Sequence, residues 1–228
     1  MQTPSKSSSA QHSQADRLAL GWLHTARFLT TASQLDQLPA LDVPEIAFVG
    51  RSNAGKSTAI NTLTQQTRLA FASRTPGRTQ HINLFALGRA GATDTVFADL
   101  PGYGYAAVPL ADKQRWQRVM ASYLVQRRQL AAVVLLCDAR RGLHALDEAL
   151  LELIRPRVAG GLPFLLLLTK ADKLNRAEQN KALAIAKLQA GGGEVLLFSA
   201  PKRQGVASAA QWLHRVAAEA GQPLPTAD

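Results

Sequence analysis

Short aliphatic runs alternate with longer segments of helical periodicity from Glu45 onward. Such an alternation is typical of a largely parallel sheet with helices on both faces. Five runs are almost continuously apolar, as buried parallel strands are, and a sixth alternates apolar and polar residues, which favours an antiparallel edge strand. We therefore expect an α/β three-layer fold with a six-stranded, mostly parallel sheet. The six runs are EIAFVG (45–50), QHINLFALG (80–88), TVFADL (95–100), AAVVLLCD (131–138), FLLLLTK (164–170) and EVLLFSA (194–200).

Apolar stripes predict the helices between these runs. Asn175, followed three positions later by Glu178, reads as a capping box that opens one of them. Another helix should follow a turn at Gly142 and end at Pro156, because proline disrupts helical hydrogen bonding. Three stripes consist of Trp116, Val119, Met120, Tyr123 and Leu124; of Leu146, Ala149, Leu150, Leu153 and Ile154; and of Val206, Ala209, Ala210, Leu213 and Ala217.

Composition divides the chain and limits its class. Residues 1–15 are rich in Ser and Gln, so we expect a disordered polar tail, then an extension over 16–44, one domain over 45–220 and a tail over 221–228. Only short apolar stretches occur near the N-terminus, which indicates a cytoplasmic protein without a membrane span. The single cysteine, Cys137, lies in an apolar run and should be a buried structural thiol.

The net charge is +10, with a pI near 10.4. A basic surface attracts polyanions, so RNA, DNA or a ribonucleoprotein is a candidate partner; a merely soluble basic surface is the alternative.

The stretch GRSNAGKS (50–57) follows an expected strand and precedes an expected helix, which is the context of a phosphate-binding loop. Glycines allow the backbone N–H groups to turn inward around a phosphate. Lys56 would then bridge the β- and γ-phosphates and Ser57 would ligate Mg²⁺. The alternative is a glycine-rich turn with an accidental lysine. The candidate residues are Gly50, Arg51, Ser52, Asn53, Ala54, Gly55, Lys56, Ser57 and Thr58.

Three further short motifs stand at the ends of expected strands. In DLPG, Asp99 can hold the Mg²⁺ hydration shell and the Gly102 N–H can sense the γ-phosphate. In TKAD, Asp172 can accept hydrogen bonds from guanine N1–H and N2–H₂, and Lys170 would lie along the base and ribose. In FSA, the Ala200 N–H can donate to guanine O6. The candidates are Asp99, Leu100, Pro101 and Gly102; Thr169, Lys170, Ala171 and Asp172; and Phe198, Ser199 and Ala200.

Singly, these carboxylates and hydroxyls are better explained as caps or loop groups. Four motifs in this order, each at the carboxyl end of a strand, favour a guanine-nucleotide site.

A first switch is expected in SRTPGRTQ (73–80). Thr79 is favoured over Thr75, because Thr75 precedes Pro76 in a turn. Thr79 would coordinate Mg²⁺ directly, like Ser57, while Asp99 would do so through water. Arg74 and Arg78 either contact phosphate or RNA or are solvated charges. The candidate contacts are Gly77, Arg78, Thr79 and Gln80, and the candidate catalytic groups are Lys56, Thr79 and Gly102.

Together the motifs GRSNAGKST, RTPGRTQ, DLPGYGYA, TKADK and FSA, with RFLTTASQLDQLP before the first strand, resemble the TRAFAC class of GTPases. The resemblance is closest to the EngB family of ribosome-biogenesis GTP-binding proteins and covers about residues 27–220. It implies a Ras-like fold and Mg²⁺-dependent GTP binding; we also expect a GTPase of weak intrinsic activity and a monomer. It also implies a role in assembly of the large ribosomal subunit and a requirement in cell division and septation.

Three single residues in these motifs lead to further expectations. Tyr103 stands where a water-orienting glutamine would stand, so unaided hydrolysis should be slow. Thr169 stands where asparagine is usual, which puts in doubt the tie from this motif to the phosphate loop. Asn53 either places K⁺ beside the phosphates or stabilises the loop.

Two other classes remain open: a small-molecule kinase with a phosphate loop, and a basic RNA-binding module with a structural nucleotide. Selectivity for guanine over adenine nucleotides would exclude the kinase. An affinity of the protein for RNA that differs between its GTP-bound and GDP-bound states would exclude the RNA-binding module.

Overall fold

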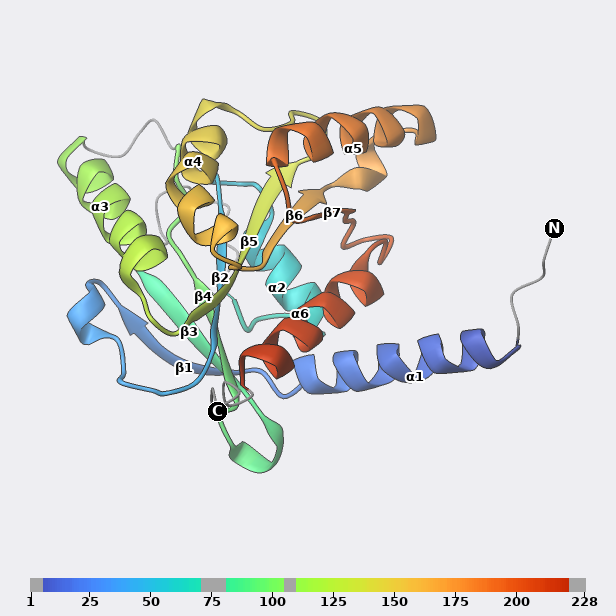
Figure 1. Cartoon of the computed structure of the whole chain (residues 1–228), viewed down its shortest axis with the longest axis horizontal. Helices are drawn as coiled ribbons and strands as arrows, with labels where there is room; N and C mark the ends of the chain where they lie inside the picture. The colour runs from blue at the N-terminus through green and yellow to red at the C-terminus, as the bar shows by residue number, and fades with distance from the viewer. Residues whose placement is uncertain (1–5, 71–80, 105–109, 222–228) are drawn as a thin grey trace, which may run out of the picture.

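One seven-stranded sheet forms the centre of the molecule (Figure 1). The computed structural model describes residues 6–70, 81–104 and 110–221. The strand order is β1-β3-β4-β2-β5-β6-β7, and β3 runs in the direction opposite to the other six strands. This confirms the expected α/β architecture. The strands are β1 (Arg27–Ala32), β2 (Glu45–Gly50), β3 (Ile82–Leu87), β4 (Thr95–Asp99), β5 (Leu130–Asp138), β6 (Phe164–Thr169) and β7 (Glu194–Leu197).

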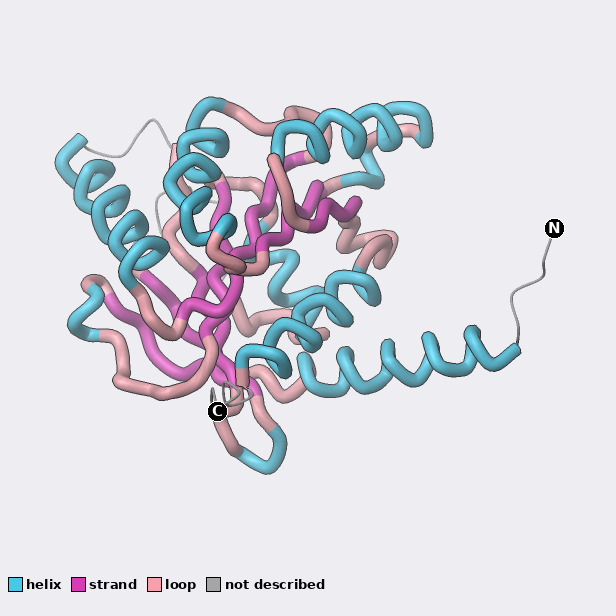
Figure 2. The backbone as a smooth tube through the Cα atoms, in the orientation of Figure 1, coloured by secondary structure: helices cyan, strands magenta, loops and turns pink. Residues whose placement is uncertain are grey.

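Helices cover both faces of the sheet (Figures 1 and 2). One apolar cluster joins the sheet to α1 (Lys6–Leu23), α2 (Lys56–Thr64) and α6 (Val206–Ala220). The other joins it to α3 (Leu110–Gln126), α4 (Ala145–Ala159) and α5 (Arg176–Ala190). Because both faces are covered, every residue of β2 and β6 is buried. Three short 3₁₀ turns complete the described elements: η1 (Leu35–Gln37), η2 (Arg89–Gly91) and η3 (Ala171–Lys173).

The sheet has one strand more than the six we expected, because β1 lies within the segment assigned to an N-terminal extension. β1 pairs with β3, from Arg27 opposite Ala86 to Ala32 opposite Ile82. The run that contains β3 is therefore not at the edge; β1 takes that place and leaves Phe28 57% exposed. A strand with one solvated side is short of apolar residues, which weakens its signal in the sequence.

The helix α1 corrects the expected disordered tail, since residues 6–15 are helical. The C-terminal end of α1 anchors the helix, because Ala19, Trp22 and Leu23 are buried in the apolar cluster shared with α6. A helix that is anchored at one end can extend into a polar stretch at small cost, because each added residue also adds a hydrogen bond.

The stripes of α3 and α6 face the core as predicted, except that the side chain of Trp116 lies outside the described part of the structure, and α4 shows two differences. Pro156 does not end α4, which continues to Ala159. Its ring is solvent-exposed in the last turn, so the helix loses one hydrogen bond without a clash in the core. The buried stripe of α4 is also displaced, since Asp147 is buried and Leu146 is 37% exposed. The predicted capping box of α5 is confirmed: Glu178 N donates to Asn175 Oδ1 over 3.0 Å and Asn175 N to Glu178 Oε2 over 2.8 Å.

A buried carboxylate organises the amino edge of the sheet, opposite the carboxyl ends of the parallel strands. Glu45, at the start of β2, is 1% exposed. It accepts hydrogen bonds from the Tyr123 hydroxyl over 2.5 Å and from Arg127 Nε and a terminal guanidinium nitrogen over 2.9 and 2.6 Å. The guanidinium also donates to the Pro39 carbonyl over 3.2 Å. This ion pair and its neighbouring hydrogen bonds thus join β2, α3 and the segment before β2.

Replacing Arg127 tests this network. Arg127→Met should lower the free energy of unfolding by about 3 kcal/mol and Tm by roughly 6–12 °C, because a buried carboxylate loses its cation. Thermal unfolding followed by circular dichroism measures the change. Arg155→Met, which breaks an exposed pair with Glu152, is the matched control and should change stability by less than about 1 kcal/mol. Equal losses in the two variants would contradict the assigned role of Glu45.

Candidate functional site

The loop between β2 and α2 has the backbone form that phosphate binding requires. Asn53 and Gly55 adopt left-handed conformations, with φ of 65° and 95°. The loop is also packed closely on β5, since a Cβ added to Gly50 would lie 2.7 Å from the Leu136 carbonyl oxygen. Ala54 and Lys56 are buried, while Ser57 lies partly exposed at the start of α2. The loop therefore combines left-handed turns with a helix N-terminus, where positive potential favours an anion.

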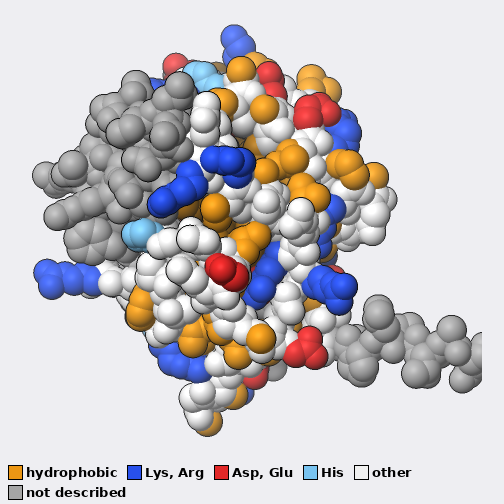
Figure 3. All heavy atoms as spheres, turned by 90° about the vertical axis from the view of Figure 1, so that its left-hand side faces the viewer, with side chains coloured by type: hydrophobic (Ala, Val, Ile, Leu, Met, Phe, Trp, Pro, Cys, Tyr) orange, Lys and Arg blue, Asp and Glu red, His pale blue; other side chains and the backbone are white. Residues whose placement is uncertain are grey.

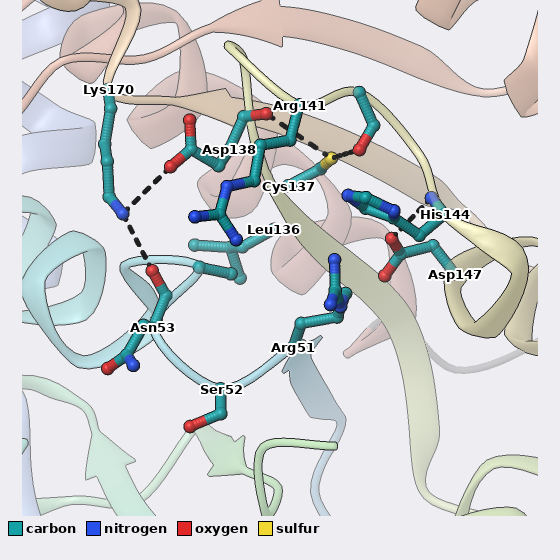
Figure 4. Close-up of a pocket in the computed structure, with 12 residues that line it drawn as sticks. Arg51, Ser52, Asn53, Leu136, Cys137, Asp138, Arg141, His144, Asp147 and Lys170 are labelled. Carbon is teal, nitrogen blue, oxygen red and sulfur yellow. Dashed lines mark hydrogen bonds and ion pairs between the residues drawn. The ribbon is translucent and has the colours of Figure 1, made fainter. Parts of the chain in front are cut away.

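Two side chains from the end of β6 hold the carbonyl groups of this loop. The Thr169 hydroxyl, which is buried, lies 2.5 Å from the Ala54 oxygen and 3.1 Å from the Cys137 oxygen. Lys170 Nζ donates to the Asn53 oxygen over 2.8 Å (Figure 4). The sequence puts in doubt whether the TKAD motif, with a threonine in place of the usual asparagine, is attached to the phosphate loop. The Thr169 hydroxyl nevertheless makes this connection.

Lys56 and Asp99 form a buried ion pair across the loop. Asp99 is the last residue of β4, and its side chain is 2% exposed, against 8% for Lys56. The pair brings the end of β4 to the start of α2, where Ser57 follows Lys56 in the chain. A hydroxyl and a carboxylate are hard oxygen donors of the kind Mg²⁺ prefers, so these residues fit a Mg²⁺ site.

The segment after β4 lies against the phosphate loop. The Ser52 N–H donates to the Tyr103 carbonyl over 2.8 Å, and a Cβ added to Gly102 would lie 3.2 Å from Ser52 Cα. Only glycine fits there without displacing the loop. Leu100 and Pro101, between Asp99 and Gly102, are buried.

Tyr103 itself is turned toward α4. Its hydroxyl donates to Asp147 Oδ1 over 2.6 Å, and the side chain is 8% exposed. Burial and the neighbouring Asp147 carboxylate raise the pKa of Tyr103 well above its ordinary range, so its hydroxyl stays protonated. This placement agrees with the expectation that Tyr103 does not serve as a water-orienting residue.

Asp172 and Ser199 join the last two motifs. The Ser199 hydroxyl donates to Asp172 Oδ1 over 2.7 Å, and Ser199 is fully buried. This hydrogen bond lowers the pKa of Asp172, and Lys173, 3.6 Å away, acts in the same direction. The Ala171 N–H donates to the Phe198 carbonyl over 3.1 Å. The Asp172 carboxylate is thus kept ionised and is oriented by a neighbouring motif.

The structure brings the four predicted motifs to one edge of the sheet. Hydrogen bonds or ion pairs join the phosphate loop to DLPG through Lys56, to TKAD through Thr169, and TKAD to FSA through Ser199. Ala200 follows Ser199 at this edge and is partly exposed, and Thr58 is exposed in the first turn of α2. The first-switch residues Gly77, Arg78, Thr79 and Gln80 lie outside the described residues, as do Arg74 and Thr75.

The Arg51 side chain does not face the same way as the other loop residues. It points toward α4, into a pocket of about 130 Å³ that Asp138, Arg141, His144 and Asp147 also line (Figure 4). Its buried Nε has no hydrogen-bond partner among the described residues. Arg51 can therefore reach a nucleotide through its backbone but not through this side-chain conformation.

Two carboxylates of this region were missed from the sequence. Asp138 ends β5 and contacts Lys170, and Asp147 holds Tyr103. Asp138 could have been predicted, since it also ends an apolar run at the carboxyl edge of the sheet. Nothing in the helical pattern around Asp147 indicates that its side chain is buried. Cys137, by contrast, is buried as expected, and burial raises the pKa of its thiol to about 12.

Comparison with known proteins decides the class. Residues 45–170 match the family model described as 50S ribosome-binding GTPase. A probable GTP-binding protein EngB from Albidiferax ferrireducens is 73% identical over 201 residues, which are 86% of this chain and 97% of that protein. The chain belongs to the EngB family of GTP-binding proteins. A second EngB relative, from Acidovorax ebreus, is 72% identical and covers 88% of this chain and 94% of its own.

Solved structures agree at the level of the fold. A crystal structure of a probable GTP-binding protein EngB matches 77% of this chain and 99% of its own, with a TM-score of 0.62 and 20% identity. The structure of Era with MgGDPNP and nucleotides 1506–1542 of 16S ribosomal RNA matches 76% of this chain and 56% of its own, with a TM-score of 0.62 and 22% identity. Membership of the EngB family makes this chain a phosphate-loop GTPase rather than a small-molecule kinase.

The Thr169 tie leads to a prediction for nucleotide affinity. Thr169→Val keeps the shape of the side chain but leaves the buried Ala54 carbonyl without its donor, at a cost of about 1–3 kcal/mol. We expect roughly 5- to 100-fold weaker GDP binding, measured by titration with a fluorescent GDP analogue.

Two variants control for this loss. Thr169→Ser keeps the hydroxyl and should retain most of the affinity. Thr64→Val removes another buried hydroxyl, which bonds the Ile60 carbonyl over 2.9 Å at the far end of α2, and should lower stability without a comparable effect on binding. If Thr64→Val weakens binding as much as Thr169→Val, general destabilisation explains the result.

Asp172 leads to a prediction for base selectivity. Asp172→Asn should weaken GTP binding by about 10²–10⁴-fold, because two hydrogen bonds to a carboxylate are lost. Preference should shift toward xanthine nucleotides, whose position 2 carries an acceptor. Competition binding with GTP and XTP measures the shift, and the exposed Asp42→Asn variant is the matched control. Unchanged guanine selectivity would remove Asp172 from the base site.

Proposed function

We propose that this EngB-family GTPase is a Mg²⁺-dependent nucleotide switch in assembly of the large ribosomal subunit. The observation that carries the proposal is the direct attachment of the TKAD motif to the phosphate loop through Thr169 and Lys170. This attachment fixes the distance between a site for phosphates and a site for a guanine base. A nucleotide of the right length can then engage both ends.

In this proposal each motif has a separate task. Backbone N–H groups from Gly50 to Thr58 surround the phosphates, and Lys56 leaves Asp99 to bridge the β- and γ-phosphates. Asp172 selects guanine, Lys170 lies along the base and ribose, and the Ala200 N–H donates to guanine O6. Ser57 and Thr79 would hold Mg²⁺ directly and Asp99 through water; the ion would neutralise charge on the β- and γ-oxygens.

Hydrolysis would proceed by in-line attack of water on the γ-phosphorus, without a covalent intermediate. Lys56 and the N–H groups of Thr79 and Gly102 would stabilise the negative charge that spreads over the γ-phosphoryl oxygens. The side chain of Tyr103, held by Asp147, offers no group to orient the water. We therefore propose weak intrinsic activity, which a partner, K⁺ placed by Asn53, or a remote side chain would raise.

The proposed partner is the large ribosomal subunit or its precursor RNA. The matching family is described as 50S ribosome-binding, which supports the large subunit. Era, a structural neighbour, has been solved with a fragment of 16S ribosomal RNA, which supports an RNA partner in general. The net charge of +10 supports a polyanionic partner. On the face shown in Figure 3, Lys and Arg side chains are interspersed with acidic and apolar ones rather than gathered in one patch. The expected first switch (73–80) and the DLPG motif, and not charge alone, would then determine the affinity for the ribosomal partner.

The remaining parts of the proposal rest on the resemblance to the EngB family. We place the protein in the cytoplasm as a monomer, with a requirement in normal cell division and septation. Within the described ranges, every helix is too short or too polar to cross a membrane.

Co-sedimentation with ribosomal subunits tests the switch. Binding to the large subunit should be at least about tenfold tighter with a non-hydrolysable GTP analogue than with GDP, since a switch must bind its partner differently in two states. The Asp172→Asn variant with the same GTP analogue serves as the control and should not sediment at nucleotide concentrations that saturate the natural chain. Equal sedimentation in both nucleotide states would reduce the protein to an RNA-binding module with a structural nucleotide.

A further inference from the structure

Asp138, the last residue of β5, lies beside the contact between Lys170 and the phosphate loop (Figure 4). Its Oδ2 atom is 3.0 Å from Lys170 Nζ, and the same ammonium donates to the Asn53 carbonyl over 2.8 Å. The Asp138 side chain is 9% exposed, and that of Lys170 is 34% exposed. One ammonium group therefore joins a carboxylate of β5 to the backbone of the phosphate loop.

We propose that Asp138 is a positioning residue of the nucleotide site, which holds Lys170 against the Asn53 carbonyl and so prolongs the residence of the bound guanine nucleotide. The proposal rests on the GTP binding established for the family and deepens the role given to Lys170.

The backbone at both ends of this contact gives the first argument. Lys170 and Asn53 are both left-handed, with φ of 58° and 65°. Such a conformation is unfavourable for lysine, and less so for asparagine, and persists where surrounding contacts hold it. The Lys170 ammonium is one of these contacts. A lysine side chain has several freely rotating bonds, so a second fixed partner is needed to keep the ammonium at one carbonyl.

The charge state of Asp138 gives the second argument. Burial alone would raise the pKa of Asp138, but hydrogen bonds from Arg140 and Lys170 outweigh burial, so the pKa lies well below its ordinary value. Arg140 donates to Oδ1 through Nε over 2.9 Å and to Oδ2 over 2.7 Å. The carboxylate is thus ionised and already fixed in place when it meets Lys170. This differs from a typical exposed ion pair, in which both partners are mobile.

The dissociation rate of a fluorescent GDP analogue tests the proposal. Asp138→Asn should accelerate dissociation about tenfold, because the amide replaces a charge-assisted hydrogen bond with a neutral one. In a Lys170→Met background the same substitution should change the rate less than about twofold, since there is no ammonium left to position. A tenfold acceleration in both backgrounds would overturn the proposal.

Two controls separate positioning from folding. Glu152→Gln removes a carboxylate held in the same two-pronged manner by Arg155, over 3.0 and 2.6 Å, and should leave dissociation unchanged. Arg140→Gln removes hydrogen bonds that fix the Asp138 carboxylate but leaves its charge beside Lys170, so it should accelerate dissociation by less than Asp138→Asn does. If Arg140→Gln accelerates dissociation more than Asp138→Asn, integrity of the loop after β5 is responsible and the proposal fails.

The design also distinguishes this inference from the proposed function. If the unmodified chain does not bind guanine nucleotides, the function fails; if it binds them and Asp138→Asn has no effect, only the role of Asp138 fails. Should Asp138→Asn not fold, Asp138→Glu keeps the charge and moves it by one methylene. Its dissociation rate should lie between those of the natural chain and Lys170→Met, and a rate faster than that of Lys170→Met would count against the proposal.

Discussion

The site depends on where the carbonyl groups of the phosphate loop find hydrogen bonds. A loop that turns its N–H groups toward phosphates directs carbonyls the other way, and buried carbonyls without donors are costly. Here the end of β6 supplies donors: Thr169 reaches the buried Ala54 oxygen, and Lys170 reaches the more exposed Asn53 oxygen. The same two contacts attach the base-recognition motif to the phosphate loop. A requirement of backbone chemistry thus sets the separation between the two halves of the nucleotide site.

Much of this arrangement could be predicted from the sequence, because apolar runs report burial on both faces of a parallel sheet. The motifs DLPG, TKAD and FSA follow such runs, and strands that run parallel bring their carboxyl ends to one edge, so their proximity followed from the topology. The cap of α5 at Asn175 was equally legible, because it depends on residues three positions apart.

The parts that could not be predicted depend on contacts between distant segments. β1 has one solvated side, so Phe28 and the two threonines after it gave a weak pattern, although aromatic and β-branched residues were present. Asp147 could not be identified from the helical pattern, because its burial depends on Tyr103, which is 44 residues away. The continuation of α4 past Pro156 depends on the ring facing solvent, which the helical period alone does not determine.

The added strand β1 has a consequence for how a signal could travel. β3 pairs with β1 from Ile82 to Ala86 on one side and with β4 from Asn83 to Leu87 on the other. Thr79 precedes the first residue of β3, Ile82, by three positions. Because slippage of β3 would break two ladders of hydrogen bonds at once and turn its buried side chains outward, Ile82 acts as a fixed anchor for the chain before it. A change of conformation in the chain that precedes β3 would therefore end at Ile82 and leave the rest of the sheet in place.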